Sequence, residues 1–215
     1  MPPILHLVQR PTDPGDDTAR VAMRDVYDLD EVDLSAFRGV AVSSACDQRH
    51  LAERSERLSD WVRGGGLLLA QGHPIRRYVD GMPQHRKLDF HSTRDLWLEA
   101  VGPHPIWDGV DRRDLLFNTG VPGVHSFDRL KEIGVAGFYA HAYLVDLPDD
   151  ATVITGIGPG RLPVDASYPL GAGEVVVHLG GDLLNHTRPG TSAVDLGERA
   201  HAFLEGAYAR LEAAR

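Results

Sequence analysis

Small and polar residues follow three apolar runs of this sequence, and several are of types that bind ligands or catalyse reactions. The groups come after residues 40–42, 67–70 and 175–179. If these runs are neighbouring parallel strands, the groups meet at the carboxyl edge of one sheet, where open α/β sheets bind their ligands. The predicted ligand-binding residues are Ser43, Ser44, Cys46, Gln71, Gly72, His73, Gly181 and Asp182.

His73 and Asp182 have the widest chemical range in this set. A histidine can act as an acid, a base or a metal ligand near neutral pH. With His186, the two would offer imidazole and carboxylate ligands to a divalent metal if the fold brought them together. Spacing alone does not show this, and a loop role for His73 and a capping role for Asp182 over residues 183–185 are simpler. We predict no metal and no cofactor, and we assign no catalytic residue.

Cys46 is the single cysteine of the chain. An intrachain disulfide and every multi-cysteine metal site are therefore excluded. Its position after a strand would allow a nucleophile, with Asp47 or His50 nearby. We favour a small buried thiol at the start of a helix, because neighbours in sequence do not by themselves form a triad.

Two loops deserve comparison with known binding loops. Residues 156–160 are rich in glycine, but the arginine, leucine and proline that follow cannot open the helix that a phosphate loop requires, so we predict a turn. Cations gather at residues 76–77 and 85–87, just after the predicted pocket strand. They could steer an anionic substrate to the sheet or form a lid, and a solvated loop is the simpler alternative.

Apolar runs and helical patterns alternate along the chain. The runs predict strands at residues 4–8, 20–27, 39–44, 67–70, 135–145, 152–155 and 174–179. Helices are expected at residues 48–63, 92–101 and 192–213. A strand, a helix and a strand in succession form a βαβ unit, which requires a parallel sheet. We predict one three-layer α/β/α domain over residues 1–215, with a mainly parallel, flavodoxin-like sheet and an irregular insertion near 76–130.

The last of these helices carries an apolar stripe. Its members recur at three- and four-residue steps and are Leu196, Ala200, Phe203, Ala207 and Leu211. Such a stripe needs an apolar partner, because an isolated helix of this length is only marginally stable in water. We expect it to form a layer of the domain against residues 175–179, and a dimer contact is the alternative.

Charge and composition restrict the possible partners. The 215 residues include 22 Lys+Arg and 31 Asp+Glu, a formal net charge of -9. Nucleic acids and anionic membranes bind basic surfaces, so neither is an expected partner. No window approaches the roughly 20 apolar residues of a membrane span, and residues 1–9 lack the basic region of a signal peptide. We therefore predict a cytoplasmic protein, and homo-oligomerisation remains open.

Three stretches, taken in order, resemble the class I glutamine amidotransferase-like superfamily. They are residues 37–44, the helix end and strand Trp61-Val62-Arg63-Gly64-Gly65-Gly66-Leu67-Leu68-Leu69, and residues 171–182. The segment His104-Pro105-Ile106-Trp107-Asp108-Gly109-Val110 resembles one often found there before a sheet extension. More narrowly, the chain resembles members without amidotransferase chemistry, such as the ThuA-like proteins and the middle domain of certain β-galactosidases.

The resemblance does not carry the amidotransferase chemistry with it. In that family a nucleophilic cysteine follows the strand after the glycines, and here Ala70 stands in that register. The late strand should also supply a histidine and, two residues later, a glutamate, whereas Gly180 follows His178 at that spacing. Glutaminase activity is therefore not expected.

Two functions follow from these observations. The first is a non-amidotransferase member of the superfamily that binds a small polar ligand, sugar-like or anionic, or a protein partner. The alternative is a hydrolase or sugar-modifying enzyme that uses His73, Asp182 and Cys46 at the same sheet edge. The missing nucleophile favours binding over catalysis.

Overall fold

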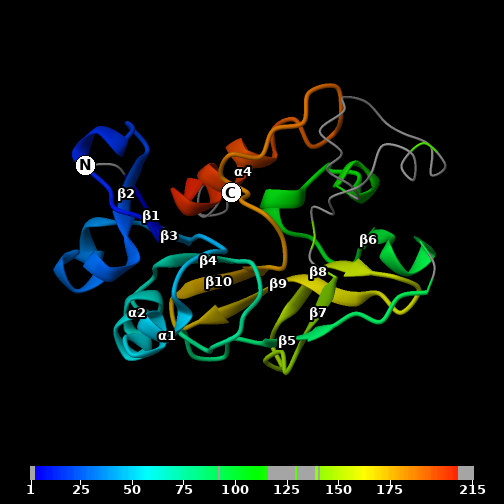
Figure 1. Cartoon of the computed structure of the whole chain (residues 1–215), viewed down its shortest axis with the longest axis horizontal. Helices are drawn as coiled ribbons and strands as arrows, with labels where there is room; N and C mark the ends of the chain where they lie inside the picture. The colour runs from blue at the N-terminus through cyan, green and yellow to red at the C-terminus, as the bar shows by residue number, and fades with distance from the viewer. Residues whose placement is uncertain (1–2, 92, 116–128, 130–138, 140, 208–215) are drawn as a thin grey trace.

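An eight-stranded mixed sheet forms the centre of the fold in the computed structural model, which describes residues 3–91, 93–115, 129, 139 and 141–207 (Figure 1). The strands lie in the order β2-β1-β3-β4-β10-β9-β8-β6. Their bounds are β1 Ile4–Val8, β2 Val21–Asp25, β3 Gly39–Val42, β4 Leu67–Gln71, β6 Leu98–Ala100, β8 Thr152–Ile157, β9 Leu162–Leu170 and β10 Gly173–His178. The chain is thus a mixed α/β protein with a large, mostly parallel sheet.

The strands β2, β1, β3, β4 and β10 run parallel to one another. The central four bury nearly every residue, as expected for strands covered on both faces. In their register, Val42 lies beside Ala70, and Ala70 lies beside Val177. The carboxyl ends of β3, β4 and β10 therefore reach one edge of the sheet together, as the apolar runs predicted.

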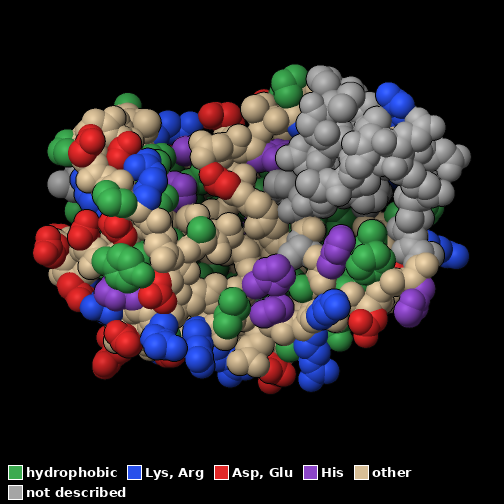
Figure 2. All heavy atoms as spheres, in the orientation of Figure 1, with side chains coloured by type: hydrophobic (Ala, Val, Ile, Leu, Met, Phe, Trp, Pro, Cys, Tyr) green, Lys and Arg blue, Asp and Glu red, His purple; other side chains and the backbone are tan. Residues whose placement is uncertain are grey.

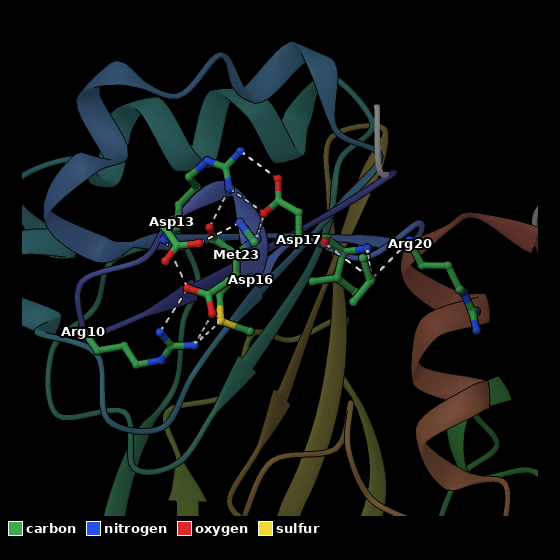
Figure 3. Close-up of polar contacts among 10 residues, drawn as sticks. Arg10, Asp13, Asp16, Asp17, Arg20 and Met23 are labelled. Carbon is green, nitrogen blue, oxygen red and sulfur yellow. Dashed lines mark hydrogen bonds and ion pairs between the residues drawn. The ribbon is translucent and has the colours of Figure 1, made fainter.

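The loop that connects β1 to β2 is held by ion pairs, whereas a longer crossover connection would contain an α-helix. Arg10 pairs with Asp16 at 3.1 Å, and Arg24 pairs with Asp17 at 2.7 Å (Figure 3). The backbone N–H of Met23 also donates to the Asp17 carboxylate at 2.9 Å. These contacts order a polar loop whose only described helical element is the 3₁₀ turn η1 (Pro14–Asp16).

The other half of the sheet is antiparallel, and here two sequence predictions are wrong. The helix expected at residues 92–101 is a 3₁₀ turn, η4 (Thr93–Leu96), followed by the edge strand β6. The long strand β9 was not predicted, because proline and polar residues interrupt its apolar pattern. It forms because β8 and β10 pair with it on either side, so tertiary pairing outweighs local preference. The turn predicted for residues 156–160 connects β8 to β9 through residues 158–161.

A two-stranded antiparallel ribbon of β5 (Gln84–Lys87) and β7 (Ala142–Val145) forms a second sheet. The strand expected at residues 135–145 is thus shorter among the described residues, and positions 135–138 and 140 lie outside them. Within the insertion expected near 76–130, the structure describes β5, β6 and the 3₁₀ turns η4, η5 (Pro105–Trp107) and η6 (Arg112–Leu115). Residues 116–128 and 130 of that insertion lie outside the described residues.

The helix predicted at residues 48–63 is two helices, α1 (Gln48–Ala52) and α2 (Ser55–Arg63). Arg54 interrupts them with a non-helical backbone, φ -116° and ψ 18°, and its guanidinium pairs with Asp30 at 2.5 Å. The break reflects this tertiary contact, which no spacing of apolar residues reveals. None of the helices in the described ranges has the length and apolar composition needed to cross a membrane.

The carboxyl-terminal helix α4 (Leu196–Leu204) is a layer of the fold. Its predicted stripe is buried at Leu196, Ala200 and Phe203, and the helix packs mainly on β3, β4 and the turn η5, whereas β10 was the expected partner. Arg20 at the start of β2 adds ion pairs to Glu198 and Glu205 at 2.7 and 2.6 Å. Residues 208–213 of the predicted helix lie outside the described part of the chain.

Replacing Phe203 by alanine should destabilise the whole domain. Its ring is 4% exposed and lies 5.0 Å from the ring of His104, so the substitution leaves a cavity between α4 and η5. We expect a loss of about 3 to 5 kcal/mol in the free energy of unfolding, measured by chemical denaturation. Val194→Ala, at an exposed position, is the matched control. An unchanged midpoint with loss of a dimer in sedimentation would instead support the dimer contact.

Candidate functional site

The carboxyl ends of β3 and β4 open into a pocket of about 560 Å³. Its lining comes from the loop after β3, the start of α1 and the loop after β4, and consists of Ser44, Ala45, Cys46, Asp47, Gln48, Arg49, His73, Ile75 and Arg76. Of the predicted ligand-binding residues, three line this pocket: Ser44, Cys46 and His73. The volume lies within the range that small-molecule sites occupy.

Gln48 holds the two loops of the pocket together. Its side-chain Nε2 donates to the backbone carbonyl of His73 at 2.6 Å. Its Oε1 accepts from the backbone N–H groups of Ile75 at 2.7 Å and of Arg76 at 3.0 Å. The loop after β4 is therefore fixed to the first turn of α1 by one amide side chain. Sequence reasoning missed Gln48, because its role depends on which loop faces it.

Gly72 allows the same two loops to approach closely. It has φ +81°, and a Cβ built there would lie 2.6 Å from the Cβ of Ser44. Any other residue would meet both backbone strain and a clash. Its N–H donates to the carbonyl of His178 at 2.9 Å. Gly72 thus shapes the pocket without lining it.

Charges of both signs surround the pocket, but the negative one is already engaged. Asp47 caps α1 by accepting from the N–H groups of Arg49 and His50 at 2.9 and 3.3 Å, and it accepts from the Tyr27 hydroxyl at 3.1 Å. These backbone hydrogen bonds hold the pKa of Asp47 below its ordinary value. Within the described residues, neither the guanidinium of Arg49 nor that of Arg76 has an ion-pair partner, so positive charge remains available there.

Two histidine rings contact each other at the pocket, and one of them, His73, lines it. The rings of His73 and His85 meet edge to face with centroids 4.7 Å apart, and His85 Nδ1 lies 3.2 Å from the carbonyl oxygen of Pro74. Burial, and then the neighbouring His85, lower the pKa of His73. Figure 2 shows cationic side chains along the lower rim of the molecule, below β5 and α1, with histidine side chains just above them.

Cys46 is a buried thiol, as the simpler interpretation predicted. Its Sγ lies 3.1 Å from the backbone oxygen of Leu7, and its side chain is 6% exposed. Burial raises the pKa of Cys46 to about 12. A thiol that stays protonated at neutral pH is a poor nucleophile, so this residue contributes shape to the pocket and not reactivity.

The remaining predicted residues lie outside the pocket lining. Gln71 is buried, and its side chain joins β3 to the later loop by donating to Val42 and accepting from the N–H of Leu183 at 2.6 Å. Asp182 accepts from the N–H of Leu184 at 2.9 Å and from the side chain of Asn185 at 2.5 Å. This is the capping role that the sequence favoured for Asp182. Ser43 and Gly181 are partly buried beside these groups.

The structure does not bring the possible metal ligands together. His73 lines the pocket, while Asp182 is engaged in its own loop. Across residues 3–91, 93–115 and 141–207, no group of three or more His, Cys, Asp or Glu side chains could hold a metal ion.

A buried acid–base group at the end of β10 was missed by sequence reasoning. His178 Nδ1 lies 2.6 Å from Asp165 Oδ1, and both side chains are fully buried. The hydroxyl of Tyr139 donates to the other oxygen of Asp165 at 2.5 Å. The carboxylate comes from the antiparallel neighbour β9, where Asp165 lies directly opposite His178. The amidotransferase pattern would instead place a carboxylate two residues after the histidine. In the sequence, this buried group is indicated by a single aspartate, Asp165, among the apolar and small residues of β9.

This buried group extends toward a buried arginine. Arg112 donates to the Thr155 hydroxyl at 2.9 Å and to the carbonyls of Trp107 and Val110 at 3.1 and 2.7 Å. Burial lowers the pKa of Arg112, while Asp165 and Tyr139 act in the opposite direction. Because the side chains of His178 and Asp165 are fully buried, the group is a polar part of the core.

No family model matches this chain, and no curated protein matches it. The solved structure of a cytoplasmic protein, STM3548 from Salmonella typhimurium, matches with a TM-score of 0.54 and 14% identity over 93% of this chain and 98% of that one. Another, the cytoplasmic protein STM1381 from Salmonella typhimurium LT2, matches at 0.50 and 10% over 96% and 98%. At these identities the likeness shows the fold alone.

A further match is part of a longer enzyme chain. The β-galactosidase from Rahnella sp. R3 aligns with a TM-score of 0.49 and 11% identity, over 98% of this chain and 31% of that one.

Removing the carboxylate of Asp165 should be severely destabilising. Asp165→Ala removes from the core the carboxylate to which the Tyr139 hydroxyl donates and against which His178 Nδ1 lies. We expect a loss of about 3 to 5 kcal/mol in the free energy of unfolding, measured in urea. The matched control is Asp60→Ala, which breaks an exposed pair with Arg63 and should change the midpoint little. Equal small effects of both substitutions would refute the structural role of the buried group.

Acid should weaken the fold through His186. Burial lowers the pKa of His186 to about 4, and the neighbouring His178 and Arg188 act in the same direction. The unfolded chain, with a histidine pKa near its ordinary 6.5, takes up the proton first as the pH falls. Stability is therefore retained above about pH 6.5 and lost progressively toward about pH 4. Urea midpoints across this interval should fall more steeply for the wild type than for His186→Gln, and identical slopes would exclude His186 as the cause.

Proposed function

We propose that the protein binds a small anionic ligand in the pocket at the carboxyl ends of β3 and β4. The observation that carries this proposal is the pair of guanidiniums, Arg49 and Arg76, that line the pocket without an ion-pair partner among the described residues. Arginine binds carboxylate and phosphate groups through paired N–H donors. His73 supports the same preference whenever it is protonated.

The charge of the whole chain makes this local arrangement informative. With a formal net charge of -9, the protein repels anions at long range. Free cations gathered at one preformed pocket therefore favour a small anion that enters the pocket over an extended polyanion. A ligand of this kind also fits the position, because open α/β sheets bind ligands beyond the carboxyl ends of their strands.

We further propose that the chain is a non-amidotransferase member of the class I glutamine amidotransferase-like superfamily, of the ThuA-like type. The order β2-β1-β3-β4-β10 supports a flavodoxin-like sheet, because it repeats the 2-1-3-4-5 order of that class with β10 in fifth place. A single three-layer domain with an insertion near 76–130 and a cytoplasmic location belong to this proposal. The two Salmonella proteins of similar fold are described as cytoplasmic, which supports that location.

The alternative, a hydrolase or sugar-modifying enzyme, has less support. Its proposed groups were His73, Asp182 and Cys46. The raised pKa of Cys46 makes its thiol a poor nucleophile. The carboxylate of Asp182 accepts hydrogen bonds from Leu184 and Asn185 in its own loop. Ala70, the residue in the register of the amidotransferase cysteine, is buried inside β4. Binding is therefore the function that this geometry supports best.

Isothermal titration with inorganic phosphate and with citrate, after a thermal-shift screen of phosphates, sugars and amino acids, tests the proposal. Arg76→Ala should weaken binding of the better anion about tenfold or more, because it removes a charge-assisted contact. Arg77→Ala is the matched control, since Arg77 pairs with Asp146 at 3.3 Å and does not line the pocket. Affinity should rise as the pH falls toward the lowered pKa of His73. The proposal fails if no anion binds saturably, or if both variants bind like the wild type.

A further inference from the structure

A second pocket lies at the outer edge of the sheet, away from the first. It has a volume of about 480 Å³ and is formed by η4, β6 and the turn between β8 and β9. β6 is the last strand of the sheet and lies at the right of Figure 1. No residue of this pocket belongs to the first one, so the two can be tested separately.

An exposed indole forms one wall of this second pocket. The side chain of Trp97 is 52% exposed, whereas Trp107 in the core is 2% exposed. The backbone of Trp97 is nevertheless fixed, because its N–H donates to the carbonyl of Arg94 at 3.2 Å and its carbonyl accepts from Gly158 at 2.8 Å. A large flat ring exposed at the surface, on a backbone that is hydrogen-bonded on both sides, can stack on another ring.

The turn that lines the pocket with Trp97 carries an arginine in a strained backbone conformation. Arg161 has φ +48°, a left-handed backbone that residues other than glycine, asparagine and aspartate seldom adopt. Its Nε donates to Glu99 at 2.6 Å, and its terminal nitrogens make no hydrogen bond within the described residues. Gly158 allows the turn to lie against η4, since a Cβ there would be 2.8 Å from the carbonyl oxygen of Asp95. Strained residues of this kind concentrate at binding sites.

The charges of the pocket favour an anion. Arg94 has no ion-pair partner among the described residues, while Glu99 is matched by Arg161. The lining therefore keeps one unmatched positive charge, and the free nitrogens of Arg161 add donors beside it. Trp97, Arg94 and Arg161 together offer a ring surface and an anion-binding group within one cavity.

We propose that this second pocket binds a small ligand that joins a flat ring to an anionic group, the chemistry of a mononucleotide. The ring stacks on Trp97, and the phosphate is bound by Arg94 and Arg161. The proposal does not depend on the function of the first pocket.

Tryptophan fluorescence gives a direct test with adenosine monophosphate as the probe. Wild-type protein should show saturable quenching, and Trp97→Leu should lose it while Trp61 and Trp107 remain. Adenosine and inorganic phosphate, each carrying one half of the ligand, should bind at least about tenfold more weakly than the nucleotide. Arg77→Ala, which lines neither pocket, should leave the nucleotide affinity unchanged.

A second variant, Arg161→Gly, separates a loss of binding from a loss of folding. Glycine accepts the left-handed backbone at position 161, so this variant should unfold at the same or a higher denaturant concentration. Its affinity for adenosine monophosphate, measured by titration calorimetry, should nevertheless fall about tenfold. Three outcomes would each overturn the proposal: no saturable quenching by the nucleotide, wild-type affinity for the nucleotide in both Trp97→Leu and Arg161→Gly, or quenching of Trp97 by phosphate alone at concentrations as low as those of the nucleotide.

Discussion

The parallel register of β3, β4 and β10 is the constraint on which the rest of the structure depends. Val42, Ala70 and Val177 lie in one row, β3 ends there, and β4 and β10 end one residue later, so all three strands leave the sheet at the same edge. The loop after β3 and the loop after β4 then meet at Gln48 and Gly72, and this contact creates the first pocket. A shift of one strand by a single residue would turn its side chains to the opposite faces and separate these loops.

The same edge shows two different uses of polar side chains. On one side, Arg49, Arg76 and His73 remain accessible around a pocket, and the charges of the two arginines are available to a ligand. On the other, His178 and Asp165 satisfy each other in the core, where an unpaired charge would be costly. The distinction is one of exposure, since both groups contain residue types that catalyse reactions in other proteins. It explains why we assign binding to the first group and stability to the second.

The antiparallel half of the sheet contributes two features, the buried polar group around Asp165 and the second pocket. β9 brings Asp165 opposite His178, and its turn with β8 carries Arg161 to the edge of the molecule. β6 then covers the side of β8 and presents Trp97 beside that turn. Both the buried polar group and the second pocket are therefore products of strands that the parallel core does not require.

The sequence by itself determined the parallel strands and the edge at which polar residues gather, because burial on both faces demands continuous apolar runs at β1, β3, β4 and β10. It also indicated the buried face of α4 and the inert character of Cys46. Only the tertiary structure decided that Gln48 fastens the pocket, that Gln71 and Asp182 serve their own loops, and that Asp165 faces His178. These roles depend on partners distant in the chain: Leu183 is 112 positions from Gln71, and the strand β9 forms from an interrupted pattern only because β8 and β10 lie beside it. Local patterns report which residues are buried, whereas the partner of a polar side chain is set by which strands and loops the fold brings together.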